Sequence, residues 1–190
     1  GKHENLCPAI MGGISWNAGS YSPKTGLFYK IGYEWCMDLE VVKTTPVRDP
    51  MTQLNISANF KAGPAKGESR MYGHVDARDP ITGKLSWSIQ FDVPPLASLL
   101  STGGNLLFVP DAAGILRAYD ATTGKLLWTH NDGIGHNGGI ITYAAKGNKQ
   151  YIAVMTGWGS LVGDSYGEWF GEPWVSMPKD QGILKVFALP

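Results

Sequence analysis

Two copies of one motif decide the fold: ARDPITGKLSW over Ala77–Trp87 and AYDATTGKLLW over Ala118–Trp128. Both copies follow the pattern A-x-D-x-x-T-G-K-L-x-W, and their tryptophans lie 41 residues apart. A repeat of about 40 to 50 residues is typical of four-stranded propeller blades. The motif therefore predicts an all-β protein built from repeated sheets.

Each copy is interpreted as a tight turn between two strands. The aspartate side chain can accept backbone N–H bonds within the turn, and the glycine supplies a positive φ. The next strand carries its tryptophan outward to pack against a neighbouring blade, which is a structural role. A weaker third copy spans Ser20–Tyr29, where Ser22 stands in place of the aspartate and the tryptophan is lost.

Other apolar runs fit the same layout. We expect strands at Leu106–Val109, Ile115–Tyr119, Tyr151–Thr156 and Ile183–Leu189. Together these strands amount to about three to four blades. Because a closed propeller needs at least four blades and the motif is usual in larger ones, we expect a partner segment to complete the ring.

Three stretches lack this pattern. Between Leu39 and Tyr72 it loosens, and Thr44–Pro50 and Lys61–Gly67 are expected to be long connections. A third, aromatic-rich stretch at 157–180 is predicted to be a long loop. Long structured loops on a propeller are where ligand sites are built. We otherwise treat residues 1–190 as part of one propeller domain.

Composition excludes several classes of function. Lys and Arg total 16, as do Asp and Glu, so the formal net charge is zero and nothing favours binding to nucleic acid or an anionic membrane. The sequence contains no run of 18 apolar residues, so no transmembrane helix is expected. The 25 glycines and seven tryptophans instead favour a β-rich fold with many tight turns.

Familiar catalytic and metal motifs are missing from the sequence. The four histidines show no zinc-ligand spacing, and neither a G-x-S-x-G nucleophile turn nor a C-x-x-C-H haem motif occurs. His130 and His136 flank a turn and are expected to be solvated, although a substrate-side role for the segment from Gly135 stays open. The two cysteines, Cys7 and Cys36, could be bonded or reduced and buried.

Several motifs occur in a fixed order around the repeats: Cys7-Pro8, GGxSWN over 12–17, Cys36-Met37-Asp38, KQYIAV over 149–154 and Gly157-Trp158-Gly159. With the repeats, this ordered set resembles the C-terminal third of the pyrroloquinoline-quinone (PQQ) alcohol dehydrogenases, over almost the whole chain. The resemblance implies an eight-bladed propeller, PQQ as cofactor, and a Ca²⁺ or lanthanide ion beside it. It also implies a periplasmic enzyme that passes electrons from an alcohol or sugar to a cytochrome c or quinone acceptor.

The resemblance implies no catalytic or metal-binding residue in this chain, because the base and the metal ligands lie in the family's upstream segments. The N-terminal part of the propeller would therefore be a separate or nicked chain. The resemblance also implies a disulfide between Cys7 and Cys36, which would suit an oxidising periplasm.

Candidate site residues follow from the same resemblance. Ser15 stands where most relatives have an asparagine that contacts the quinone, and Trp16 follows it, so both are candidate cofactor contacts. Leu161 stands where methanol-oxidising relatives have a tryptophan, and it is a candidate for both cofactor and substrate contact. Trp158, with Pro95 and Leu96 of the 93–98 segment, is expected to line the substrate pocket.

These departures remove aromatic bulk, so we expect a wider pocket and a substrate larger than methanol. The aromatic residues of 166–174 either form a packed lid or stack on a bulky substrate, with packing favoured. The alternative to an enzyme is a non-catalytic propeller that serves binding or assembly and shares the blade motif.

Overall fold

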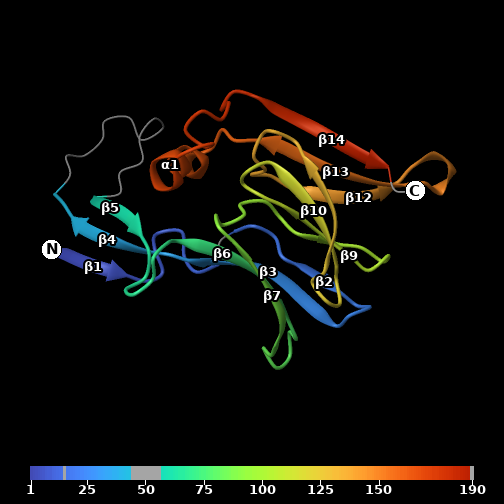
Figure 1. Cartoon of the computed structure of the whole chain (residues 1–190), viewed down its shortest axis with the longest axis horizontal. Helices are drawn as coiled ribbons and strands as arrows, with labels where there is room; N and C mark the ends of the chain where they lie inside the picture. Colours follow the sequence, from blue (N-terminus) through green and yellow to red (C-terminus); the bar gives the residue numbers. More distant parts are fainter. Residues whose placement is uncertain (15, 44–56, 189–190) are drawn as a thin grey trace.

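The computed structural model describes residues 1–14, 16–43 and 57–188 (Figure 1). In these ranges three blade-like antiparallel sheets follow one another along the chain. The first blade has the strand order β2-β3-β6-β7 and the second β8-β9-β10-β11, while the third has three strands, β12-β13-β14. Their bounds are β2 Ser20–Ser22, β3 Leu27–Glu34, β6 Tyr72–Arg78, β7 Leu85–Phe91, β8 Leu100–Ser101, β9 Leu106–Pro110, β10 Ile115–Asp120, β11 Leu126–Asn131, β12 Ile140–Ala144, β13 Gln150–Gly157 and β14 Gly182–Ala188.

A further small sheet joins β1 (Lys2–Leu6), β4 (Cys36–Val41) and β5 (Ala58–Gly63) in the order β1-β4-β5. The expectation that Lys61–Gly67 is a connection is wrong for its first residues, since β5 runs to Gly63 and pairs with β4. This strand is half-exposed and lacks a continuous apolar run, which is why its pattern resembles a loop. The predicted connection Thr44–Pro50 lies outside the described residues.

All three motif copies close the turn that the sequence predicts. The amide of Gly83 donates to the carbonyl of Asp79 at 2.9 Å, and Gly124 does so to Asp120 at 2.8 Å. Both glycines have φ +72°, where a side chain would be strained. Asp79 Oδ1 also accepts from two amides of its own turn, and these bonds lower the pKa of its carboxyl.

The weak copy at Ser20–Tyr29 does not begin a blade of its own. It joins β2 to β3 within the first blade, beside the copy that joins β6 to β7. The amide of Gly26 still donates to the carbonyl of Ser22, so the turn forms without the aspartate. Two turns of the first blade thus have the same hydrogen-bonded structure, and the described residues form three blade-like sheets, in line with the expected three to four blades.

The motif tryptophans pack between blades, as predicted. The indole Nε1 of Trp87 donates to the carbonyl of Ala121 at 3.2 Å, and its ring lies over Gly124 of the second blade. Tyr29 packs beside Trp87 and donates to the same carbonyl at 2.9 Å. Trp128 in turn contacts Phe187 of the third blade.

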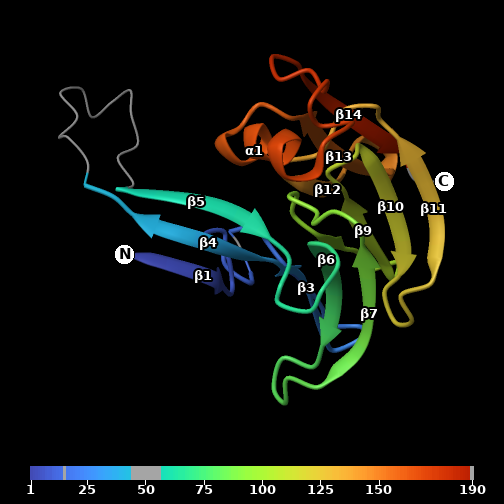
Figure 2. The same ribbon diagram turned by 60° about the vertical axis from the view of Figure 1, so that its left-hand side comes forward.

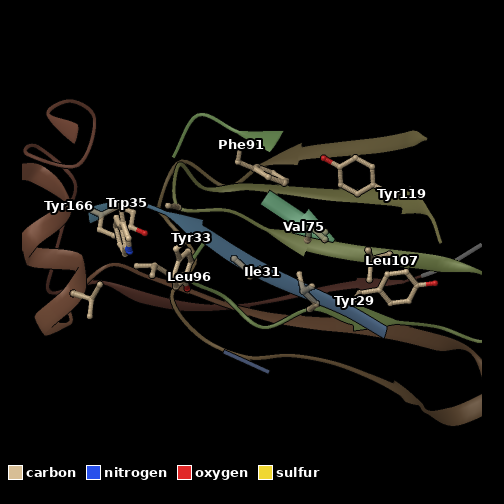
Figure 3. Packing of buried hydrophobic residues seen from close by; sticks show 14 of the residues in the cluster. Tyr29, Ile31, Tyr33, Trp35, Val75, Phe91, Leu96, Leu107, Tyr119 and Tyr166 are labelled. Carbon is tan, nitrogen blue, oxygen red and sulfur yellow. The ribbon is translucent and has the colours of Figure 1, made fainter. Parts of the chain in front are cut away.

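Two apolar clusters fill the spaces between the blades. Figure 3 shows Tyr29, Ile31 and Tyr33 in a row along β3, with Leu96 and Leu107 beside them. This larger cluster joins the first and second blades and extends to the helix α1, which spans Leu161–Phe170. A smaller cluster around Leu116 joins the second and third blades. The three sheets therefore pack side by side in chain order (Figure 2).

The stretch 157–180 is not simply a loop, because it contains the helix α1 (Leu161–Phe170). Ser160 caps its start by accepting from the amide of Gly163, and Gly171 ends it at φ +74°. The aromatic residues of 166–174 pack in the interior: Tyr166 and Trp174 are buried, and Trp169 meets Trp35 edge-on at 5.3 Å. The packing alternative therefore holds for these side chains. No helix in the described part of the chain is long and apolar enough to cross a membrane.

Candidate functional site

Loops that join successive strands bring the predicted site residues to one end of the blades. The short first strands β2 and β12 both contact β8, so the inner edges of the three blades adjoin. Two backbone bonds connect the loops at this end: Leu99 donates to the carbonyl of Ala18 at 2.9 Å, and Ser98 donates to that of Gly138 at 3.1 Å. Three loops far apart in sequence thus form one surface.

A groove of about 620 Å³ opens on this surface, and Trp16 forms one of its walls. Trp16 is 64% exposed, which is unusual for the largest apolar side chain of a packed protein. The groove is also lined by Asn137 in the β11–β12 loop, by Ser160 at the start of α1, and by Lys179 beyond α1. The groove therefore combines a free aromatic face with a few polar groups, as ligand sites do.

The start of α1 is fixed from the same side. The side-chain amide of Asn137 donates to Ser160 Oγ, which in turn accepts from the amide of Gly163 at 2.9 Å. Leu161 is the first residue of the helix, so its backbone begins next to the groove. Ser15 lies outside the described residues, and its predicted contact stays a prediction.

Pro95, Leu96 and Trp158 are buried beneath this surface. Trp158 packs edge-on against Tyr166 at 5.2 Å and lies between two glycines that line the groove. Its Nε1 is buried without a hydrogen-bond partner within the described ranges. Among the described residues that line this groove, Trp16 is present, whereas the three residues expected to line the substrate pocket are not.

The predicted disulfide between Cys7 and Cys36 is present. It joins the end of β1 to the start of β4, next to the loop that leads to Trp16. Backbone bonds from Ala9 to the carbonyl of Trp35 and from Tyr33 to that of Gly13 hold the same loop against β3 and its end. The cross-link therefore anchors the loop that carries Trp16.

Sequence reasoning missed a buried charge cluster at the end of β11. The carboxylate of Asp132 is fully buried, with Nζ of Lys185 at 2.6 Å and Nε2 of His136 at 2.9 Å. Burial lowers the pKa of His136, and the nearby Asp132 opposes this less strongly. The expectation of a solvated side chain is therefore wrong for His136, because the β11–β12 turn folds inward between two blades.

Asn17 was also missed, although it follows Trp16 directly. It is 4% exposed, and its side chain bonds to Leu96 and Tyr33. An asparagine beside a tryptophan in a glycine-rich loop gives no sequence signal of such burial. Only the fold brings the 94–96 segment against it.

Comparisons with known proteins agree with this architecture. The sequence profile of the family described as glucose/ethanol/alcohol dehydrogenase, beta-propeller domain, matches residues 68–152. Over 85% of its length the chain is 37% identical to quinoprotein alcohol dehydrogenase PedE of Pseudomonas putida. It is 34% identical over 84% of its length to a lanthanide-dependent methanol dehydrogenase of Methylorubrum extorquens. The chain covers 25% and 26% of these two relatives.

Solved structures give the same result. A europium-containing methanol dehydrogenase superposes on the whole chain with a TM-score of 0.80 at 27% identity, and the chain covers 35% of it. A quinohemoprotein alcohol dehydrogenase of Pseudomonas putida superposes on 95% of the chain with a TM-score of 0.79 at 26% identity, with 27% of it covered. The chain is therefore a β-propeller segment that belongs to the quinoprotein alcohol dehydrogenase family, and it spans about a quarter of the length of the curated relatives it matches.

Proposed function

We propose that the chain forms the C-terminal portion of a periplasmic PQQ-dependent dehydrogenase that oxidises primary alcohols to aldehydes. The observation that carries this proposal is the exposed indole of Trp16 on a groove at the inner end of the blades. A flat aromatic face in a polar-lined groove suits a planar quinone.

The groove residues fit one side of such a cofactor. Such a cofactor would supply the two-electron acceptor for the alcohol, and the hydroxyl proton would go to a base. No group of three or more His, Cys, Asp or Glu in the described ranges could hold a metal ion. We therefore assign the base and the Ca²⁺ or lanthanide ligands to another part of the propeller.

The substrate proposed is a primary alcohol larger than methanol, including bulky alcohols or carbohydrates. Pro95 and Leu96 are buried, with the Leu96 carbonyl bound by Asn17 beside Trp16, and Leu161 follows Ser160, which lines the groove. None of the three carries the aromatic bulk that narrows a methanol pocket. A wider pocket gains binding energy from each additional buried methylene of a longer alcohol.

Further blades are proposed to complete the ring, as a separate or nicked N-terminal part of the same propeller. Three blades cannot close on themselves, and the third blade has one strand fewer than the first two. Its outer face is apolar and exposed, which is costly in water and matches the faces that pack between the other blades. That face carries Ile141, Tyr143, Met155, Leu184 and Val186.

The disulfide supports the periplasmic location, because such bonds persist in oxidising compartments. A cytochrome c or a quinone is the proposed electron acceptor. The use of a lanthanide is supported by two relatives, a lanthanide-dependent and a europium-containing methanol dehydrogenase. Calcium remains the alternative ion.

The test is quinone binding by the complete propeller that contains this chain, with Trp16→Phe as the variant. We expect a quinone absorbance band on the native protein and about a threefold weaker affinity in the variant, since the smaller phenyl ring keeps about half of a stacking contribution of about 1.4 kcal/mol. Tyr143→Phe, on the outer face of the third blade, is the matched control and should bind as the native protein does. No quinone band on the native protein would instead favour a non-catalytic propeller.

A further inference from the structure

Three successive backbone carbonyls, those of residues 94–96, are each contacted by a side chain from a different part of the chain. Tyr166 of α1 donates to the carbonyl of Pro94 at 2.8 Å. Tyr33 of β3 lies 3.3 Å from the carbonyl of Pro95, and Asn17 donates its side-chain amide to that of Leu96. The 94–96 segment belongs to no strand, so these contacts replace a β-ladder.

Asn17 is the centre of this arrangement because it acts as donor and acceptor at once. Its Oδ1 accepts from the hydroxyl of Tyr33 at 2.7 Å, while its Nδ2 donates to Leu96. A tyrosine hydroxyl has one proton, so the 2.7 Å bond takes it and the contact with Pro95 is the weaker branch. The backbone carbonyl of Asn17 also accepts from Lys30.

The network is closed to water. Asn17 and Tyr33 are buried, and Tyr166 and Leu96 are fully so. A buried amide that loses its partner cannot turn to solvent, so the arrangement permits one orientation of the loop. Because Trp16 is the neighbouring residue, the orientation of its indole depends on how Asn17 is held.

The other end of the network reaches α1 and the β11–β12 loop, next to residues that line the groove. Tyr166 is on the helix that Leu161 begins, and the 94–98 segment donates from Ser98 to Gly138, which lines the groove. One buried network therefore spans from the Trp16 wall to the α1 wall. Its geometry sets the distance between these walls.

We propose that Asn17 is a positioning residue: held by Tyr33 and by the Leu96 carbonyl, it fixes the Trp16 indole relative to α1 and thereby sets which lengths of alcohol the groove admits. This inference rests on the proposed dehydrogenase function and deepens it by naming the device that selects the substrate.

The test compares two tyrosines of the same strand in the complete holoenzyme. Tyr33→Phe removes the hydroxyl bonded to Asn17 and keeps the ring. Tyr29→Phe is the matched control, because Tyr29 is also buried on β3 and donates to a backbone carbonyl, that of Ala121, between blades. Asn17→Ala is the second variant.

Two readouts are taken on fluorotryptophan-labelled protein. The first is the ¹⁹F resonance of Trp16, assigned by its loss in Trp16→Phe. The second is the ratio of kcat/KM for hexanol to that for ethanol. We expect Tyr33→Phe and Asn17→Ala to shift or broaden the Trp16 resonance and to change the ratio by at least about threefold, mainly through KM. Tyr29→Phe should leave both unchanged.

A Trp16 resonance and a substrate ratio in Tyr33→Phe that match the native protein would overturn the proposal, and so would equal changes in Tyr29→Phe. If Asn17→Ala fails to fold, Tyr33→Phe alone decides. If the native protein oxidises no alcohol, the proposed function fails, whereas the ¹⁹F comparison still decides whether Asn17 positions Trp16.

Discussion

Replacing Gly124 with alanine tests whether the docking of Trp87 joins the first two blades. A Cβ atom at this position would lie 3.0 Å from two ring carbons of Trp87, closer than ordinary van der Waals contact. The ring cannot retreat freely, because its Nε1 donates to Ala121 and Tyr29 packs beside it. The substitution should therefore push the blades apart or break that bond.

The matched control is Gly83→Ala, which occupies the same position of the other motif copy. Both glycines have φ +72°, but a Cβ atom at Gly83 would meet no atom within 4 Å. Alanine in the left-handed region costs about 1 kcal/mol, which both variants share. Overpacking adds about 1 to 3 kcal/mol for Gly124→Ala alone.

Urea unfolding followed by tryptophan fluorescence measures the difference. With a slope of about 2 kcal/mol per molar, the midpoint of Gly124→Ala should fall about 0.5 to 1.5 M below that of Gly83→Ala. In a Trp87→Ala background the two glycine substitutions should lower the free energy of unfolding equally, because the ring that makes their effects differ is absent. Equal midpoints of the two single variants, with Trp87 intact, would refute the docking argument.

Three further outcomes follow from single features. Reducing the Cys7–Cys36 bond should lower the free energy of unfolding by about 3 to 4 kcal/mol in the chain-entropy model, measured by melting with and without reductant; no change would contradict it. Because the pKa of His136 is lowered in the folded state, the folded protein binds fewer protons, so stability should hold above about pH 6.5 and decline as pH falls below it. His136→Gln should reduce this dependence of stability on pH, measured by urea unfolding at several pH values, and an unchanged dependence would mean that other groups cause it. Lys185→Met leaves the fully buried Asp132 carboxylate without its ammonium partner and should cost about 3 to 5 kcal/mol in the same assay, whereas a loss below about 1 kcal/mol would mean that water or His136 replaces it.

The repeated motif was the most predictable part of the fold because its chemistry is local. The turn at Asp79–Gly83 needs only a side chain that accepts amides and a glycine that tolerates positive φ. The packing of Trp87 between blades follows from the repeat itself. The expected three to four blades also agree with the three blade-like sheets of the described residues, and the copy at Ser20–Tyr29 uses the same turn inside the first of them.

Helix α1 shows why local patterns mislead in irregular stretches. Two glycines and three aromatic residues in Leu161–Phe170 weaken any helical pattern, and the helix depends on its Ser160 cap and on packing against Trp35 and Trp158. The contact with Trp35 comes from a distant part of the chain. Composition alone therefore predicts a loop here.

The candidate site was likewise only partly predictable from the sequence. Trp16 was selected from a short motif of the resembled family; its side chain lines the groove, and its contact with a cofactor stays a prediction. Asn17 and Asp132 were not found, because a buried polar side chain is identified by its partners, and those partners lie on other strands. Long-range polar networks are a property of the fold rather than of a motif.

The central claim is that this chain provides one wall of a quinone site in an alcohol dehydrogenase. Its most direct test is dye-linked oxidation of primary alcohols by the complete propeller, with PQQ and either Ca²⁺ or a lanthanide added. We predict turnover that requires both the quinone and the metal and that favours ethanol or longer alcohols over methanol. Absence of turnover with every quinone–metal combination, in a protein that is folded and contains all its blades, would contradict the account.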